Sequence, residues 1–78
     1  MIEFLDYNVE EYIVLNNNYD NEEKIYYMNS YEFKNNLLIL HCEEDVLYFN
    51  NINLNSVNIS YLFIEFEFDN KYIKISKF

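Results

Sequence analysis

A chain of 78 residues with a single cysteine forms one small domain, and no internal disulfide can hold it together. Its 14 carboxylates outnumber its five basic residues, and the formal net charge of −9 argues against unaided binding to DNA or RNA. Because 51 % of the residues are hydrophobic and 21 % are aromatic, we expect a folded core in a single domain over residues 1–78.

Residues 1–15 are compatible with two structures. Ile2, Leu5, Val9 and Tyr12 share one stripe of a helix, whereas Glu11–Leu15 taken alone resembles a β-strand. We expect at most one short helix in this part of the chain, and the pattern leaves helix or strand open.

The segment Asn16–Glu23 is predicted to be a loop, because Asn and Asp dominate it. The chain contains no glycine and no proline, so Asn, Asp and Ser must form its turns. The aromatic-rich segment Lys24–Phe33 follows, and its residue types predict an extended strand.

A β-hairpin is predicted in the middle of the chain. The short apolar runs Leu37–Cys42 and Val46–Phe49 flank Glu43-Glu44-Asp45, which favours two strands joined by an acidic loop. The alternative is a helix from Asn35 to Asn50, but its apolar residues would fall on all sides.

A second hairpin is predicted at the end of the sequence. Leu62–Phe68 and Lys71–Lys77 both alternate between apolar and polar residues, and Asp69-Asn70 interrupts the pattern. A two-residue loop at this point would pair Phe66 with Ile73, Ile64 with Ile75 and Glu65 with Lys74. The three lysines of the last run predict that it forms an edge strand.

The predicted fold is therefore mainly β: a small antiparallel sheet or sandwich of five to seven short strands, with at most one short N-terminal helix. An α+β fold is the alternative. The longest apolar stretches are too short to cross a bilayer, so we expect a cytoplasmic protein with no membrane partner.

No arrangement in the sequence favours catalysis. Adjacent residues of a strand point to opposite faces, so the imidazole of His41 cannot activate the thiol of Cys42. We expect a buried Cys42 beside a half-exposed His41. The paired glutamates favour solvated surface rather than acid–base chemistry. The protein is predicted not to be an enzyme and to have no catalytic residue, metal site or cofactor.

The nine tyrosines are divided between core and contact surface. We expect Tyr61 to be part of the core. The candidates for exposed contacts are Tyr12, Tyr19, Tyr26, Tyr27 and Tyr31.

The surplus of negative charge predicts a surface that binds a basic protein. Carboxylates at alternate positions of a strand lie about 6.6–6.8 Å apart, which is similar to the spacing of phosphates along a nucleic acid strand. The series Glu65, Glu67, Asp69 has this spacing, although lysines oppose it. The residues expected to contact a partner are Glu10, Glu11, Tyr12, Tyr19, Asp20, Glu22, Glu23, Glu43, Glu44 and Asp45.

In its small size, its acidity and a composition typical of AT-rich genomes, the chain resembles phage-encoded anti-defence proteins, the anti-CRISPR proteins above all. The resemblance covers overall character and no motif, so it transfers no residue role. It implies a non-enzymatic inhibitor in the host cell that occupies the basic nucleic-acid-binding cleft of a Cas effector. The alternatives are an immunity or antitoxin-like protein that neutralises a basic toxin, and a self-associating structural protein, for example a homodimer.

Overall fold

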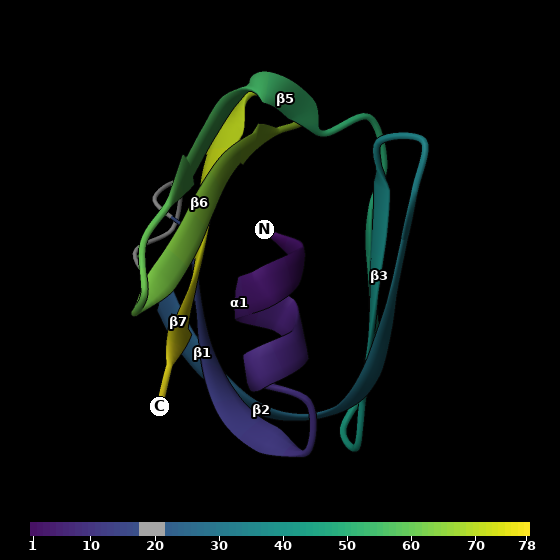
Figure 1. Cartoon of the computed structure of the whole chain (residues 1–78), viewed down its shortest axis with the longest axis vertical. Coiled ribbons are helices and arrows are strands. Elements are labelled where there is room, and N and C mark those ends of the chain that lie inside the picture. The colour runs from purple at the N-terminus through teal and green to yellow at the C-terminus, as the bar shows by residue number, and fades with distance from the viewer. Residues whose placement is uncertain (18–21) are drawn as a thin grey trace.

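The computed structural model describes residues 1–17 and 22–78, which form one antiparallel sheet and one short helix (Figure 1). The elements in chain order are α1 (Ile2–Tyr7), β1 (Glu11–Asn17), β2 (Glu22–Lys34), β3 (Leu37–Cys42), β4 (Val46–Phe49), β5 (Asn53–Ile59), β6 (Phe63–Phe68) and β7 (Lys71–Lys77). The seven strands follow the order β4-β3-β2-β1-β7-β6-β5 in the sheet. The prediction of a mainly β fold with one short N-terminal helix is confirmed.

The sheet is strongly curved, and strand β2 carries it around the helix. β2 has 13 residues, pairs first with β1 and then with β3, and shifts its register between Met28 and Ser30. Such a bulge bends a strand and increases its twist. As a result, β3 lies on one side of α1, whereas β5, β6, β7 and β1 lie on the other side (Figure 1).

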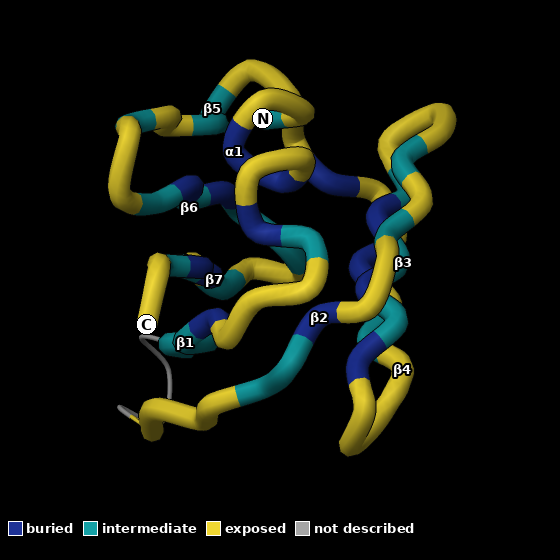
Figure 2. Tube along the Cα trace, turned by 60° about the horizontal axis from the view of Figure 1, so that its bottom comes forward, coloured by how far each residue is buried: buried dark blue, intermediate teal, exposed yellow. Residues whose placement is uncertain are grey.

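The core fills the space between the helix and the concave face of the sheet. A helix of six residues is not stable alone in water, so α1 depends on the burial of Phe4 and Leu5 against the strands. The Asn8 side chain is also buried, and its Nδ2 donates a hydrogen bond to the Phe4 carbonyl at 2.7 Å. Figure 2 shows buried residues alternating with less buried ones along β3, β6 and β7. The sheet residues of this core include Ile13, Met28, Leu38, Leu40, Phe49, Ile64, Phe66, Ile73 and Ile75.

Both interpretations of residues 1–15 hold in part. The chain is helical from Ile2 and becomes a strand at Glu11, so the predicted four-residue helical stripe does not exist. Ile2 is 52 % exposed, and Tyr12 belongs to β1. No helix in residues 1–17 or 22–78 is long and apolar enough to cross a membrane.

The two predicted hairpins are confirmed. β6 and β7 pair in the expected register, and Asp69 and Asn70 have φ angles of 51° and 60°. Two consecutive left-handed residues are what a two-residue type I′ hairpin turn requires. β3 and β4 pair at the predicted bounds, which excludes the helix over residues 35–50. A further turn of the same kind, at Asn35 and Asn36, joins β2 to β3 and was not predicted.

The predicted loop Asn16–Glu23 includes residues at both ends that belong to strands. Asn16 pairs with Glu23 and Asn17 pairs with Glu22, because the β1–β2 ladder extends to these positions. Residues 18–21 lie outside the part of the chain that the structure describes.

Two other predictions are wrong. The last strand, β7, is not an edge strand, because it lies between β1 and β6. Its Lys74 reaches water on the outer face of the sheet, where Nζ lies 4.5 Å from the centre of the Phe63 ring. Tyr61 is 76 % exposed rather than part of the core, because it lies in the bend between β5 and β6, where Lys77 covers its ring.

Helix α1 is tied to β2 by a hydrogen bond from the Tyr31 hydroxyl to Oδ1 of Asp6. Burial and this bond raise the pKa of Tyr31 from 10.0 to about 12. The folded protein therefore keeps a proton that the unfolded chain loses. The resulting stability is complete below about pH 10 and is lost as the pH rises through about 12.

We expect Tyr31→Phe to lower the free energy of unfolding by about 1 kcal/mol near neutral pH, because the hydrogen bond to the carboxylate is lost. The variant should then lose less stability than the parent protein as the pH rises from about 10 to about 12. Urea unfolding at several pH values measures both effects. Tyr48→Phe, on an exposed tyrosine of β4, serves as the control, and an alkaline decline as steep in Tyr31→Phe as in the parent would contradict this account.

Candidate partner-binding surface

Two tyrosines form the centre of the most distinctive surface of the molecule. Tyr12 of β1 and Tyr27 of β2 are direct partners across the strands, on the face opposite to the buried Ile13 and Met28. Their ring centres are 5.1 Å apart, and the ring planes meet at 75°. Edge-to-face packing of this kind is favourable for aromatic pairs, so the two rings form a defined corner on the outside of the sheet.

The acidic β3–β4 loop is attached to Tyr27 through the backbone. The Glu43 N–H donates a hydrogen bond to the Tyr27 carbonyl at 2.9 Å, and the Tyr27 N–H donates to Oε1 of Glu44 at 3.0 Å. Since both backbone groups of Tyr27 point away from β1, Tyr12 and Tyr27 form a non-hydrogen-bonded pair, in which side chains are closest. The two tyrosines and the two glutamates line an open hollow of about 380 Å³.

Two further glutamates, Glu10 and Glu11, directly precede Tyr12 in the chain. The Glu10 N–H donates to the Met28 carbonyl at 2.7 Å, and Glu11 begins the strand that carries Tyr12. The pKa of Tyr27 is raised by burial and by the negative charges of Glu10, Glu11 and Glu43. Carboxylates from two separate segments, the start of β1 and the β3–β4 loop, therefore act on one phenol.

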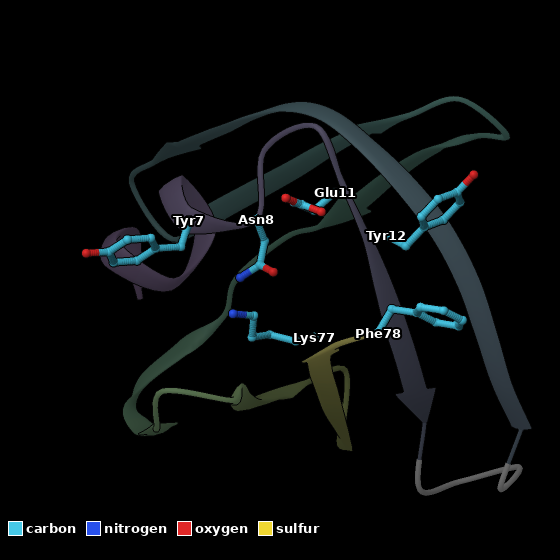
Figure 3. A pocket seen from close by; sticks show the side chains of 6 residues that line it. All are labelled: Tyr7, Asn8, Glu11, Tyr12, Lys77 and Phe78. Carbon is cyan, nitrogen blue, oxygen red and sulfur yellow. The ribbon is translucent and has the colours of Figure 1, made fainter.

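Phe78 extends the aromatic group on the other side of Tyr12. Its N–H donates to the Tyr12 carbonyl at 3.3 Å, and the two ring centres are 5.9 Å apart. Figure 3 shows Tyr12 and Phe78 side by side, and both line a second hollow of about 210 Å³ together with Tyr7, Asn8, Glu11 and Lys77. We refer to the residues of this region as the acidic aromatic surface: Glu10, Glu11, Tyr12, Tyr27, Glu43, Glu44 and Phe78.

The acidic aromatic surface is not neutralised by the protein itself. Within residues 1–17 and 22–78, none of its four glutamates forms an ion pair. The ion pairs of this part of the chain lie elsewhere, between Lys24 and Glu22 at 3.9 Å and between His41 and Glu32 at 2.6 Å. An exposed aromatic patch with a charged rim is typical of a protein-binding site.

Half of the residues predicted to contact a partner meet on this surface: Glu10, Glu11, Tyr12, Glu43 and Glu44. Glu22 and Glu23 lie at the opposite end of the β1–β2 ladder, about 13–17 Å from Tyr27 at about 3.3 Å per strand residue. The Asp45 side chain bonds within its own loop, where its Oδ1 accepts a hydrogen bond from the Val46 N–H at 2.8 Å. Tyr19 and Asp20 lie outside the described residues.

One carboxylate of the series on β6, that of Glu65, already has a partner within the protein. Glu65 pairs with Lys74 across the ladder and accepts a hydrogen bond from Nδ2 of Asn58 at 3.2 Å. Asp69 belongs to the hairpin turn, so it does not continue the spacing of Glu65 and Glu67. This row is a poor imitation of a phosphate backbone.

The contact residues expected from the sequence do not include Tyr27 and Phe78. Tyr27 is one of several tyrosines that could be exposed, and nothing in the local pattern singles it out. Its position opposite Tyr12 depends on the register of β1 with β2, and that of Phe78 depends on the pairing of β1 with β7. The alternation of Ile13 with its neighbours does indicate that Tyr12 faces outward once a strand is assumed.

The interpretation of His41 and Cys42 is confirmed. Cys42 is buried, whereas His41 is half-exposed and bonds to Glu32 on the outer face. Burial, with Glu44 and Asp45 nearby, raises the pKa of the Cys42 thiol from 9.0 to about 11, so the thiol stays protonated and unreactive at neutral pH. In the part of the chain that is described, no three His, Cys, Asp or Glu side chains are grouped so that they could hold a metal ion.

Comparison with known proteins identifies no relative: no protein-family model, no curated protein and no solved structure matches the chain. The function of the acidic aromatic surface therefore has to be inferred from its own geometry and charge.

The backbone of this surface is strained at one position. Six described residues have a positive φ, and five of them are Asn or Asp, which tolerate this conformation best. The exception is Glu10, with a φ of 62°. Left-handed residues other than glycine cost about 1–3 kcal/mol and occur preferentially at functional sites.

We expect Glu10→Gly to raise the free energy of unfolding by about 1 kcal/mol, because glycine adopts this conformation without strain. The neighbouring change Glu11→Gly is the matched control. It also removes one negative charge, but it places glycine within β1 and should lower the free energy of unfolding by up to about 1 kcal/mol. Urea unfolding of both variants tests this pair, and equal destabilisation would show that Glu10 is not strained.

Proposed function

We propose that this protein is a non-catalytic inhibitor that docks its acidic aromatic surface onto the basic nucleic-acid-binding cleft of another protein. The observation that carries the proposal is the negative charge around Tyr27: Glu10, Glu11 and Glu43 act on its phenol, and Glu44 accepts its N–H, with no ion pair to any of these glutamates in the described part of the chain. A cationic partner would neutralise this concentration of negative charge.

The two kinds of side chain have different roles in the proposed contact. The glutamates attract and orient a positively charged surface, which mainly accelerates association and gives specificity. Tyr12, Tyr27 and Phe78 supply the rigid apolar area that holds the complex once it forms. Direct binding to nucleic acid is disfavoured, because the phosphates would meet the same carboxylates.

By its resemblance in size, acidity and composition to anti-CRISPR proteins, we propose a Cas effector as the partner. The surface of such an effector that reads the PAM or holds the guide is rich in arginine and lysine, which normally contact bases and phosphates. The inhibitor would then occupy this cleft and exclude the nucleic acid.

The test compares two variants that each lose four negative charges. The first carries Glu→Gln changes in the acidic aromatic surface at Glu10, Glu11, Glu43 and Glu44. The control carries the same change at Glu22, Glu23, Glu65 and Glu67, of which the first two lie at the far end of the β1–β2 ladder and the others on β6. Binding is measured against a panel of purified Cas effectors at several salt concentrations, with labelled guide or target DNA as competitor.

We expect the first variant to lose at least about tenfold in affinity at moderate salt, and the control to lose much less. The parent protein should displace the nucleic acid, and its affinity should fall as the salt concentration rises. Equal losses in both variants, or a complex that leaves the nucleic acid bound, would contradict the proposal. Binding to a basic toxin and to none of the effectors would favour an immunity protein instead.

A further inference from the structure

We infer that the hollow beside the Tyr12–Tyr27 pair receives a single arginine side chain of the partner. This inference rests on the proposed function, because it specifies which group of a basic protein the acidic aromatic surface recognises. It concerns the hollow of about 380 Å³ that is lined by Tyr12, Tyr27, Glu43 and Glu44.

The aromatic rings favour a cation over an apolar group. Tyr12 and Tyr27 meet at 75°, so they form two walls of a corner rather than a flat stack. Phe78 lies against the far side of Tyr12 and supports it. A cation close to the face of a tyrosine ring is attracted by the electrons of the ring, and arginine is the cation most often found in this position.

The carboxylates of the hollow select a cation that donates hydrogen bonds. In the described part of the chain the Glu43 carboxylate has no hydrogen-bond partner, and Glu44 uses only Oε1, to accept the Tyr27 N–H. A guanidinium group has a planar fork of donors that matches a carboxylate with two hydrogen bonds. A quaternary ammonium group has no donors and would leave these oxygens unpaired.

The protein's own cations leave this corner open. Two aromatic rings elsewhere on the outer surface are covered by lysines: Lys74 Nζ lies 4.5 Å from the centre of Phe63, and Lys77 Nζ lies 4.8 Å from that of Tyr61. Among the residues that the structure describes, no lysine lies over the faces of Tyr12 or Tyr27, although Tyr27 experiences the negative charge of Glu10, Glu11 and Glu43.

The hollow is also formed before any partner arrives. Two hydrogen bonds to Tyr27 hold the backbone of the β3–β4 loop at Glu43 and the side chain of Glu44, and the two tyrosine rings pack edge to face. A preorganised site loses less conformational entropy on binding, which increases the affinity for a given set of contacts. Val14 and Ile25 pair next to the tyrosines on the same face, and Ile25 is 51 % exposed, so the partner finds apolar surface beside its arginine.

The experiment titrates the full chain with three short peptides that differ in one central residue. These are arginine, its neutral isostere citrulline, and lysine, each between glycines and with blocked ends. The signals of the Tyr12 and Tyr27 rings are followed by NMR. We expect the arginine peptide to shift both rings and to saturate, the lysine peptide to bind several-fold more weakly, and the citrulline peptide not to bind.

Two variants locate the contact. Glu43→Gln should lower the affinity for the arginine peptide by about fivefold while leaving the hydrogen bond from the loop backbone to Tyr27 intact. Tyr27→Leu should abolish the binding, whereas Tyr48→Leu, on an exposed tyrosine of β4, should not change it. If Tyr27→Leu unfolds, Tyr12→Leu together with Glu43→Gln provides the same test.

Equal binding of the arginine and citrulline peptides would overturn the inference, and so would equal binding of the arginine and lysine peptides. The outcome is separate from that of the proposed function. If the protein displaces nucleic acid from an effector but does not bind the arginine peptide, the proposed function stands and this inference is wrong. If the protein binds the arginine peptide but forms a complex with no effector, the hollow is an arginine site and the proposed target is wrong.

Discussion

The bulge between Met28 and Ser30 of β2 is the constraint on which the rest of the molecule depends. At this point β2 leaves the ladder with β1 and continues with β3, so the sheet turns around α1 and encloses a core. The same bend brings the β3–β4 loop next to Tyr27, the last residue before the buried Met28. Fold and candidate site are therefore consequences of one irregularity in one strand.

The two faces of the sheet differ in composition and in what they contribute to the protein. The concave face is apolar and supplies the stability that a domain without disulfides needs, through residues such as Phe66 and Leu40. The convex face includes aromatic rings and unneutralised carboxylates, which add little to stability and oppose compactness. Small proteins commonly retain such a surface for binding, because the core alone satisfies the requirements of folding.

The sequence predicts what is encoded locally. Both hairpins follow from alternation and turn residues, down to the pairing of Phe66 with Ile73, because neighbouring strands and a two-residue turn fix their own register. The position of β7 inside the sheet depends instead on its distant pairing with β1, and no local pattern carries that information. The glutamate pairs are visible in the sequence as candidate contact residues. Their position near Tyr27 is not, because it depends on the bulge in β2 and on hydrogen bonds of the β3–β4 loop that no short stretch of sequence indicates.

The left-handed conformation of Glu10 also determines how the helix joins the sheet. Asn or Asp occupies every other described position with a positive φ. At position 10 the chain changes from α1 to β1, and the Glu10 N–H donates to the Met28 carbonyl of β2. The direction in which the first strand leaves the helix is therefore set by a single residue, and a change that prevents a positive φ there would misalign β1 with its neighbour.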